Sequence, residues 1–285
     1  MSTTTFTKKF SIGGKLSVNR VGYGAMRITG KGIFGPPADK AESIRVLKKA
    51  VELGVNFIDT ADSYGPHVSE ELIAEALYPY PAGLVIATKG GLLRPGPDQW
   101  TPDASPAHLQ EALNGSLKRL KLDTIDLYQL HRIDPKVPAE KTFEFLQKAQ
   151  AAGKIKHIGL SEVTIDQVKK AQAFFEVVSV QNMYSVDNRK WDEVLDYSTQ
   201  NNIAFIPWYP LNAGNVNILE ILQEVAKKHR ATAQQIALAW LLHRADNILL
   251  IPGTSKLAHL EENLQSASIE LDEEDLEKLD KIYRS

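Results

Sequence analysis

The chain has 285 residues, of which 43% are hydrophobic and 24% are charged, the composition of an ordinary globular protein. Its formal net charge is −2 at pH 7 and neither sign dominates a long segment, which argues against a nucleic-acid-binding surface. The absence of cysteine excludes disulfide bonds, thiolate catalysis and zinc or iron–sulfur centres held by cysteine.

The N-terminal twenty residues predict a β-hairpin and no targeting signal. Residues 1–6 lack the basic start and apolar stretch of a signal peptide. No apolar run in the chain approaches the ~20 residues that span a bilayer. We therefore expect a cytoplasmic protein. Residues 6–10 and 16–18 flank the turn Gly13-Gly14 and predict a hairpin that closes the N-terminal end of a barrel.

Short apolar runs then alternate with longer amphipathic runs along the whole chain, the pattern of βα units on a parallel sheet. The predicted strands are residues 20–24, 55–58, 85–88, 125–130, 157–160, 177–180, 204–207 and 248–251. Eight such units fill the length. They predict an α/β protein with a (β/α)8 barrel, which typically needs ~250 residues, formed as a single domain over residues 1–285.

Capping residues predict where the helices lie. Asp39 is a suitable N-cap for a helix that ends before Gly54, and Ser105 followed by proline predicts the start of another. We expect three further helices over residues 69–77, 138–153 and 272–282, the last as an extra C-terminal helix. A doubly wound dinucleotide fold agrees less well, because Gly22 and Gly24 lack the third glycine of that fingerprint.

Four residues follow the ends of predicted strands with side chains suited to carbonyl reduction. Asp59, Lys89 and His131 each follow an apolar run, and Tyr64 lies in the loop after Asp59. A parallel barrel gathers its C-terminal strand ends on one face, so we expect these side chains to meet there. A lysine ammonium lowers the pKa of a nearby phenol, an aspartate holds that lysine, and a neutral histidine can orient a carbonyl.

Taken singly, each of these residues has a simpler explanation. A loop tyrosine usually packs, a lysine after a strand is usually solvated, and a lone histidine is usually a satisfied polar group. Their coincidence at three successive strand ends favours a catalytic site. Two other carboxylates are nearby: we expect Asp126 to make a structural bond inside its strand and Asp62 to stabilise the loop.

Later strand ends predict a cofactor site. Ser161, Glu162 and Gln181 offer groups suited to an amide, and Trp208 offers a flat face for a ring, although core packing explains Trp208 equally well. Residues 252–256 precede a helix, so their backbone N–H groups and Lys256 can hold a phosphate. Taken alone, Lys256 is better explained as a solvated charge.

Together these segments resemble the aldo-keto reductase superfamily over essentially the whole chain. Residues 55–65, 87–89 and 127–131 resemble the segments that carry the family's catalytic Asp, Tyr, Lys and His. The resemblance implies a (β/α)8 barrel that uses NADPH without a metal. The cofactor-binding residues that it implies are Ser161, Glu162, Gln181, Trp208, Tyr209, Leu211, Gly253, Thr254, Ser255, Lys256, His259, Glu262 and Asn263.

Within the superfamily, residues 34–37 and 64–68 resemble a bacterial branch that includes pyridoxal reductases. The chain departs from many members at three places. Glu162 stands where they have Asn, and Gly253 and His259 stand where they have Lys and Arg that bind the 2′-phosphate of NADPH. It also lacks their long C-terminal loop.

The resulting prediction is an NADPH-dependent reductase of aldehydes and reactive ketones that uses Tyr64 as its proton donor, with pyridoxal as one candidate substrate. We expect a monomer with small-molecule carbonyl substrates. The alternative is a nucleotide-binding regulatory subunit on the same fold, like the β subunits of potassium channels. A metal-dependent hydrolase would need a His-x-His pair at a strand end. Candidate pocket residues are Phe34, Arg94, Trp100, Arg132 and Tyr184.

Overall fold

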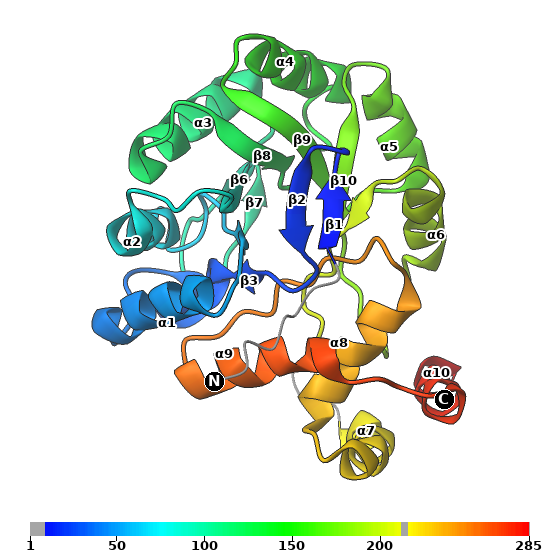
Figure 1. Cartoon of the computed structure of the whole chain (residues 1–285). Helices are drawn as coiled ribbons and strands as arrows, with labels where there is room; N and C mark the ends of the chain where they lie inside the picture. The colour runs from blue at the N-terminus through cyan, green and yellow to red at the C-terminus, as the bar shows by residue number, and fades with distance from the viewer. Residues whose placement is uncertain (1–8, 212–215, 285) are drawn as a thin grey trace.

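The computed structural model describes residues 9–211 and 216–284, in which parallel strands form a barrel surrounded by helices (Figure 1). The strands of this barrel are β3 (Tyr23–Gly24), β4 (Phe57–Asp59), β5 (Val85–Gly90), β8 (Ile125–Leu130), β9 (Ile155–Ser161), β10 (Val177–Gln181) and β11 (Ala204–Phe205). Each pairs in parallel with the next in this order.

The eighth predicted strand, residues 248–251, closes the barrel with one bridge to each neighbour. Ile248 bridges Phe205 of β11, and Leu250 bridges Val21, just before β3. Backbone hydrogen bonds continue on both sides: Leu249 N donates to Phe205 O at 2.9 Å, and Leu250 N donates to Arg20 O at 2.8 Å. The predicted (β/α)8 fold is therefore confirmed, although this closing segment and the first strand pair over fewer residues than expected.

Helices cover the outside of the barrel (Figure 1). They are α1 (Lys40–Glu52), α2 (Val68–Leu77), α3 (Pro106–Leu120), α4 (Ala139–Ala151), α5 (Ile165–Gln172), α6 (Asp192–Gln200), α7 (Val216–His229), α8 (Ala233–Arg244), α9 (Leu257–Gln265) and α10 (Glu273–Asp280). The predicted caps are confirmed, because Asp39 accepts from Glu42 N and Ser105 accepts from His108 N. In the described part of the chain, none of the helices combines the length and apolar character needed to cross a bilayer.

Strand periodicity divides the side chains between two cores. Residues such as Ile58 and Ile86 point outward into the layer between sheet and helices, whereas Phe57, Val85 and Ala87 point into the barrel. The barrel interior is apolar toward the N-terminal strand ends. The interior at the C-terminal strand ends is instead polar, because the same inward face continues to Asp59 on β4 and Lys89 on β5.

A hairpin closes the other end of the barrel, as predicted. It consists of β1 (Lys9–Ile12) and β2 (Leu16–Asn19), which are antiparallel, and it lies across the strand ends in Figure 1. Ile12 and Val18 are fully buried and complete the apolar interior cluster. Residues 6–8 of the predicted hairpin lie outside the described part of the chain.

Two long loops at the C-terminal strand ends have local structure that the sequence did not predict. The first, residues 24–38, contains the 3₁₀ turns η1 (Ala25–Ile28) and η2 (Lys31–Ile33). The second, residues 90–104, contains the short antiparallel pair β6 (Leu92–Leu93) and β7 (Thr101–Pro102). Two more 3₁₀ turns, η4 (Ser266–Ser268) and η5 (Ile282–Arg284), follow α9 and α10.

Candidate active site

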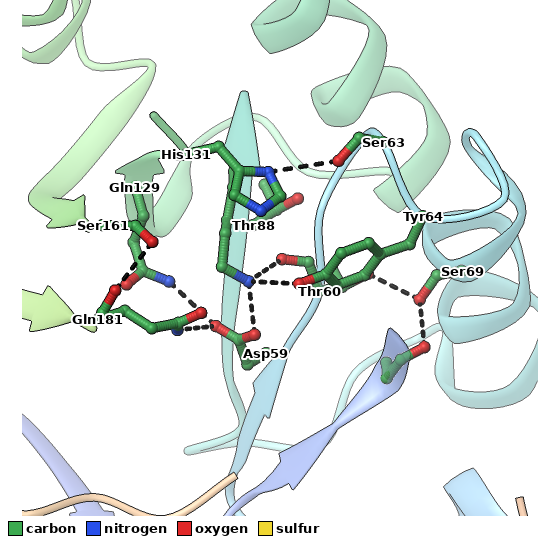
Figure 2. A network of polar contacts seen from close by, with 12 residues as sticks. Asp59, Thr60, Ser63, Tyr64, Ser69, Thr88, Gln129, His131, Ser161 and Gln181 are labelled. Carbon is green, nitrogen blue, oxygen red and sulfur yellow. Dashed lines mark hydrogen bonds and ion pairs between the residues drawn. The ribbon is translucent and has the colours of Figure 1, made fainter. Parts of the chain in front are cut away.

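Lys89 is the centre of a buried polar cluster at the C-terminal strand ends, of which Figure 2 labels Asp59, Tyr64 and His131. It extends from β5, and its Nζ lies 2.5 Å from Asp59 Oδ1, 2.8 Å from Thr60 O and 3.3 Å from the Tyr64 hydroxyl. Lys89 is 0% exposed and Asp59 2%. His131 completes the group, with its ring 5.9 Å from that of Tyr64. The four predicted catalytic side chains therefore meet at one place.

The second carboxylate oxygen of Asp59 is held by two amides. Gln129 Nε2 donates to Asp59 Oδ2 at 3.0 Å and Gln181 Nε2 donates to it at 2.9 Å. Ser179 lies behind Gln129, with its hydroxyl 3.5 Å from Gln129 Oε1. Asp59 is thus fixed on both sides, and it can hold Lys89 in one position.

Opposing effects set the proton affinities of the central pair. Burial alone would lower the pKa of Lys89, but Asp59 and Tyr64 raise it above its ordinary value, so the ammonium stays charged. Burial raises the pKa of Tyr64, and Lys89 opposes that rise. The expectation that the pKa of Tyr64 is lowered is therefore wrong, because the effect of burial is larger. Lys89 does lower this pKa, as predicted, but it offsets only part of the rise.

His131 is uncharged at neutral pH. Burial lowers its pKa well below the ordinary value, and the nearby charges of Lys89, Arg132 and Arg94 lower it further. Its Nδ1 lies 3.3 Å from the Ser63 hydroxyl. When Ser63 donates to Nδ1, the ring proton is on Nε2, which can donate to a carbonyl oxygen.

An aromatic wall covers one side of this cluster. Trp100, which is partly exposed, packs edge-on against both Tyr64 and His131, each at 6.3 Å between ring centroids. The guanidinium of Arg94 lies 3.5 Å from the Trp100 ring centroid and 5.9 Å from that of Phe34. These three predicted pocket residues therefore lie beside the catalytic cluster, and a fourth, Arg132, lies at its Ser161 side.

Arg94 also ties together the two long loops and the catalytic loop. It donates to the carbonyl oxygens of residues 32 and 33 in the first loop, of Ser63 in the catalytic loop, and of residues 96 and 99 in the second. Because all these bonds end on backbone carbonyls, Arg94 fixes the position of Trp100 without needing a charged partner.

Tyr184 does not line the site, so that prediction was wrong. Its side chain is fully buried in the outer core, where it stacks on Trp240 at 6.2 Å and packs edge-on against Phe205. Its hydroxyl contacts Asp192. The residue follows β10 closely in sequence, but it points outward between the sheet and α8.

The two carboxylates expected to be structural make no side-chain hydrogen bond to Tyr64, Lys89 or His131 among the described residues. Asp126 faces outward and pairs with Lys156 at 2.6 Å. Asp62 is buried, and its Oδ1 has no hydrogen-bond partner within residues 9–211 and 216–284. Burial and the neighbouring Glu70 raise the pKa of Asp62 well above its ordinary value, which favours its protonated form.

Ser161 and Gln181 lie next to Asp59 at the ends of β9 and β10 (Figure 2). The Ser161 hydroxyl donates to Gln181 O at 2.8 Å and accepts from Arg132 Nη1 at 3.0 Å. Gln181 uses its Nε2 on Asp59. What these residues can still offer to an amide is therefore acceptor capacity, on Ser161 Oγ and on Gln181 Oε1.

Glu162 uses its carboxylate inside the protein. Its Oε1 accepts from the Trp208 indole N–H at 2.7 Å and from Met183 N at 2.5 Å. Its backbone is left-handed, with φ 54°. Glu162 thus fixes the orientation of Trp208, whose ring is partly exposed and lies 5.7 Å from the guanidinium of Arg132.

The remaining predicted cofactor residues lie on two segments. Tyr209 is 37% exposed, and Leu211 packs partly against the core. The others lie on residues 253–263, around the start of α9. The packing explains why residue 253 is glycine, because a side chain at this position would collide with the carbonyl oxygen of Gly24 on β3. Lys256 is the N-cap of α9 and has no side-chain partner among the described residues.

Residues 20–284 match the model of the aldo/keto reductase family. The chain belongs to this family. An uncharacterized oxidoreductase of Schizosaccharomyces pombe is 52% identical over 273 residues, which cover 95% of this chain and 89% of that protein. Pyridoxine 4-dehydrogenase of Escherichia coli is 46% identical over the full length of both chains.

A solved aldo-keto reductase structure has the same fold. This enzyme, from Klebsiella pneumoniae in complex with NADPH, superposes with a TM-score of 0.82 at 24% identity, over 97% of this chain and 95% of that one. The family match and the two sequence relatives identify the present aldo/keto reductase as an oxidoreductase.

Sequence reasoning missed several residues of this aldo/keto reductase site. Gln129 had a usable signal, since it lies near the end of β8, two residues before His131, and alternation along the strand puts both on the inward face. Ser63 had none, because a loop serine is an ordinary surface residue until the loops are folded.

Proposed function

We propose that this aldo/keto reductase is an NADPH-dependent reductase of aldehydes and reactive ketones, with Tyr64 as the proton donor and pyridoxal as a substrate. The observation that carries the proposal is the contact of the Tyr64 hydroxyl with the Lys89 ammonium, which Asp59 holds in turn. A phenol in contact with a fixed cation can release its proton, because the cation stabilises the phenolate that remains.

The catalytic side chains divide the work at the carbonyl oxygen. Tyr64 and the uncharged His131 donate hydrogen bonds to this oxygen, which orients the carbonyl and polarises it. The hydride comes from the nicotinamide of NADPH when it is bound. As negative charge develops on the oxygen, Tyr64 transfers its proton there, and Lys89 stabilises the phenolate. Asp59 keeps Lys89 charged and in place.

The residues of the second half of the barrel suit a nicotinamide nucleotide. Ser161 and Gln181 offer acceptors for the N–H groups of a carboxamide, and Trp208, held by Glu162, offers a flat surface for a ring. Residues 253–256 and the N-terminus of α9 offer backbone N–H groups for phosphate, together with Lys256, whose side chain has no partner in residues 9–211 and 216–284. The NADPH complex of the Klebsiella enzyme, which has the same fold, supports this choice of nucleotide.

Pyridoxal is proposed because the chain is 46% identical, end to end, to a pyridoxine 4-dehydrogenase. Trp100, fixed beside Tyr64 and His131, gives a planar aromatic aldehyde a surface to pack against. We propose a monomer that works in the cytoplasm, as the sequence predicts.

A panel of substrates with spectrophotometry at the NADPH absorbance band tests this function. We expect turnover of pyridoxal, methylglyoxal and 4-nitrobenzaldehyde with NADPH, and faster turnover with NADPH than with NADH. NADPH binding without turnover of any aldehyde would support the regulatory-subunit alternative. A preference for NADH would contradict the proposed cofactor.

The choice between NADPH and NADH predicts a role for Lys256. Lys256→Ala should weaken the binding of NADPH by at least ~10-fold and leave the affinity for NADH nearly unchanged. The reason is that a charge-assisted contact to the 2′-phosphate, which NADH lacks, is worth about 1.5–3 kcal/mol. Dissociation constants from tryptophan fluorescence measure both. Lys141→Ala is the control, since Lys141 is exposed on α4, on the opposite side of the barrel from α9 (Figure 1). Equal weakening of both nucleotides would place Lys256 at the shared pyrophosphate instead.

A further inference from the structure

Arg132 is a partly buried cation at the edge of the catalytic cluster that the proposed mechanism does not use. It follows His131 in the chain, directly after β8. Its Nη1 donates to His131 O at 2.6 Å and to Ser161 Oγ at 3.0 Å. These bonds place the guanidinium on the Ser161 side of His131, and both anchoring residues appear in Figure 2.

The remaining donors of Arg132 are free. Its Nε and Nη2 make no hydrogen bond to the described residues, 9–211 and 216–284, and neither atom is sealed off from solvent. The two other cations beside the catalytic residues are already committed, Lys89 to three acceptors and Arg94 to backbone carbonyls. Arg132 is therefore able to donate two hydrogen bonds to a ligand.

No carboxylate of the described residues lies within ion-pair distance of Arg132. The acidic residue that acts on it is Glu162, whose Oε1 is occupied by Trp208 and Met183. A partly buried guanidinium that has no ion pair within the protein is suited to bind an anionic group of a ligand.

The charge of Arg132 also reaches the reacting groups. After burial and Lys89, it is the next influence that lowers the pKa of His131, and it opposes the rise that burial gives the pKa of Tyr64. A carbonyl bound by Tyr64 and His131 therefore has Arg132 beside it, with Trp208 flanking the guanidinium and Trp100 on the Tyr64 side.

We propose that Arg132 is a specificity-determining residue that binds a negatively charged oxygen adjacent to the reacting carbonyl of the substrate. The substrate class is carbonyl compounds with such an anion, for example an aldehyde with an ortho phenolate, as in pyridoxal, or an α-keto acid. The proposal rests on the reductase function proposed above and narrows its substrates. Arg132 contributes charge and two donors in a fixed orientation.

Matched substrates separate anion binding from general catalysis. One pair is pyridoxal and its 3-O-methyl ether, and the second is phenylglyoxylate and its methyl ester. The variants are Arg132→Met, which removes the charge, and Arg132→Lys, which keeps it. Arg45→Met is the control, because Arg45 is an exposed α1 residue paired with Glu42. The measurements are kcat/KM for each substrate, the NADPH dissociation constant and the melting temperature.

We expect Arg132→Met to lower kcat/KM at least ~10-fold for the anionic member of each pair and under ~3-fold for the neutral member, because one charge-assisted contact is lost. NADPH affinity should stay within ~2-fold, and Arg132→Lys should recover part of the loss. Equal losses for both members of each pair would overturn the proposal. Weaker NADPH binding with those equal losses would assign Arg132 to the nicotinamide.

The same experiment distinguishes this inference from the proposed function. If the phenylglyoxylate pair shows the dependence on Arg132 while pyridoxal is not reduced, the pyridoxal assignment fails and the Arg132 proposal stands. If the wild type reduces 4-nitrobenzaldehyde but no member of either pair, the Arg132 proposal fails and the reductase function stands. Failure to reduce any of these compounds contradicts both.

Discussion

Replacing Tyr64 by phenylalanine should lower the rate of carbonyl reduction by ~10²-fold or more and leave NADPH affinity nearly unchanged. The substitution keeps the ring, which packs edge-on against Trp100 and His131, and deletes the proton that is transferred. Lys89 keeps Asp59 and Thr60 O as partners, so the fold should lose little stability. The measurements are kcat with a slowly reduced aldehyde and nucleotide binding by fluorescence.

Tyr128 provides a matched control for this variant. It lies on β8, the strand next to β5, but it faces the outer core, and its buried hydroxyl has no hydrogen-bond partner within the described ranges. Tyr128→Phe removes the same atom from a tyrosine outside the site and should leave turnover intact. Near-normal turnover of a poor aldehyde by Tyr64→Phe would refute the assignment of Tyr64 as the acid.

Replacing Lys89 by methionine should abolish most of the activity and destabilise the protein. The variant raises the pKa of Tyr64 further, since the cation that opposes the effect of burial is gone. It also leaves Asp59 as a buried carboxylate without its ion pair, which costs about 3 kcal/mol, or roughly 5–10 °C in melting temperature for a chain of this size. The amides of Gln129 and Gln181 still hold Asp59 and keep the cost from being larger.

The double variant Asp59→Asn/Lys89→Met should recover part of this stability but no activity, because the unpaired charge is removed while the cation beside Tyr64 remains absent. Melting temperature and NADPH oxidation are measured for both single variants and the double. Lys40→Met is the control, since it breaks an exposed ion pair with Glu75 and should change stability by under ~0.5 kcal/mol. Additive losses without any rescue would show that Asp59 and Lys89 are not coupled.

The clustering of the four candidate catalytic residues was predictable because strand ends can be recognised from sequence. An apolar run followed by a polar residue marks the place where a buried strand leaves the sheet, and a parallel barrel brings these places to one face. Asp59, Lys89 and His131 were found in this way. Tyr64 was found because it follows Asp59 by five residues, in the loop after the same strand. The caps at Asp39 and Ser105 were likewise local signals.

What the sequence did not reveal depends on contacts between distant loops. The β6–β7 pair has only two residues in each strand, and Arg94, which stacks on Trp100 within the second loop, also donates to the carbonyl oxygens of residues 32 and 33 in the first. For Glu162 the sequence predicts a contact with an amide of the cofactor, but it did not reveal the hydrogen bond to Trp208, 46 residues away. That the whole chain forms one domain, and that the named side chains bind and transform substrate, stay predictions.

The barrel is closed by residues 248–251, where Leu250 pairs with Val21 near the beginning of the chain and Ile248 pairs with Phe205. During synthesis, all four catalytic side chains leave the ribosome within the first 131 residues. The segment that closes the barrel follows more than a hundred residues later, together with residues 253–263. A nascent chain therefore carries all four candidate catalytic side chains long before the segment that closes the barrel is made.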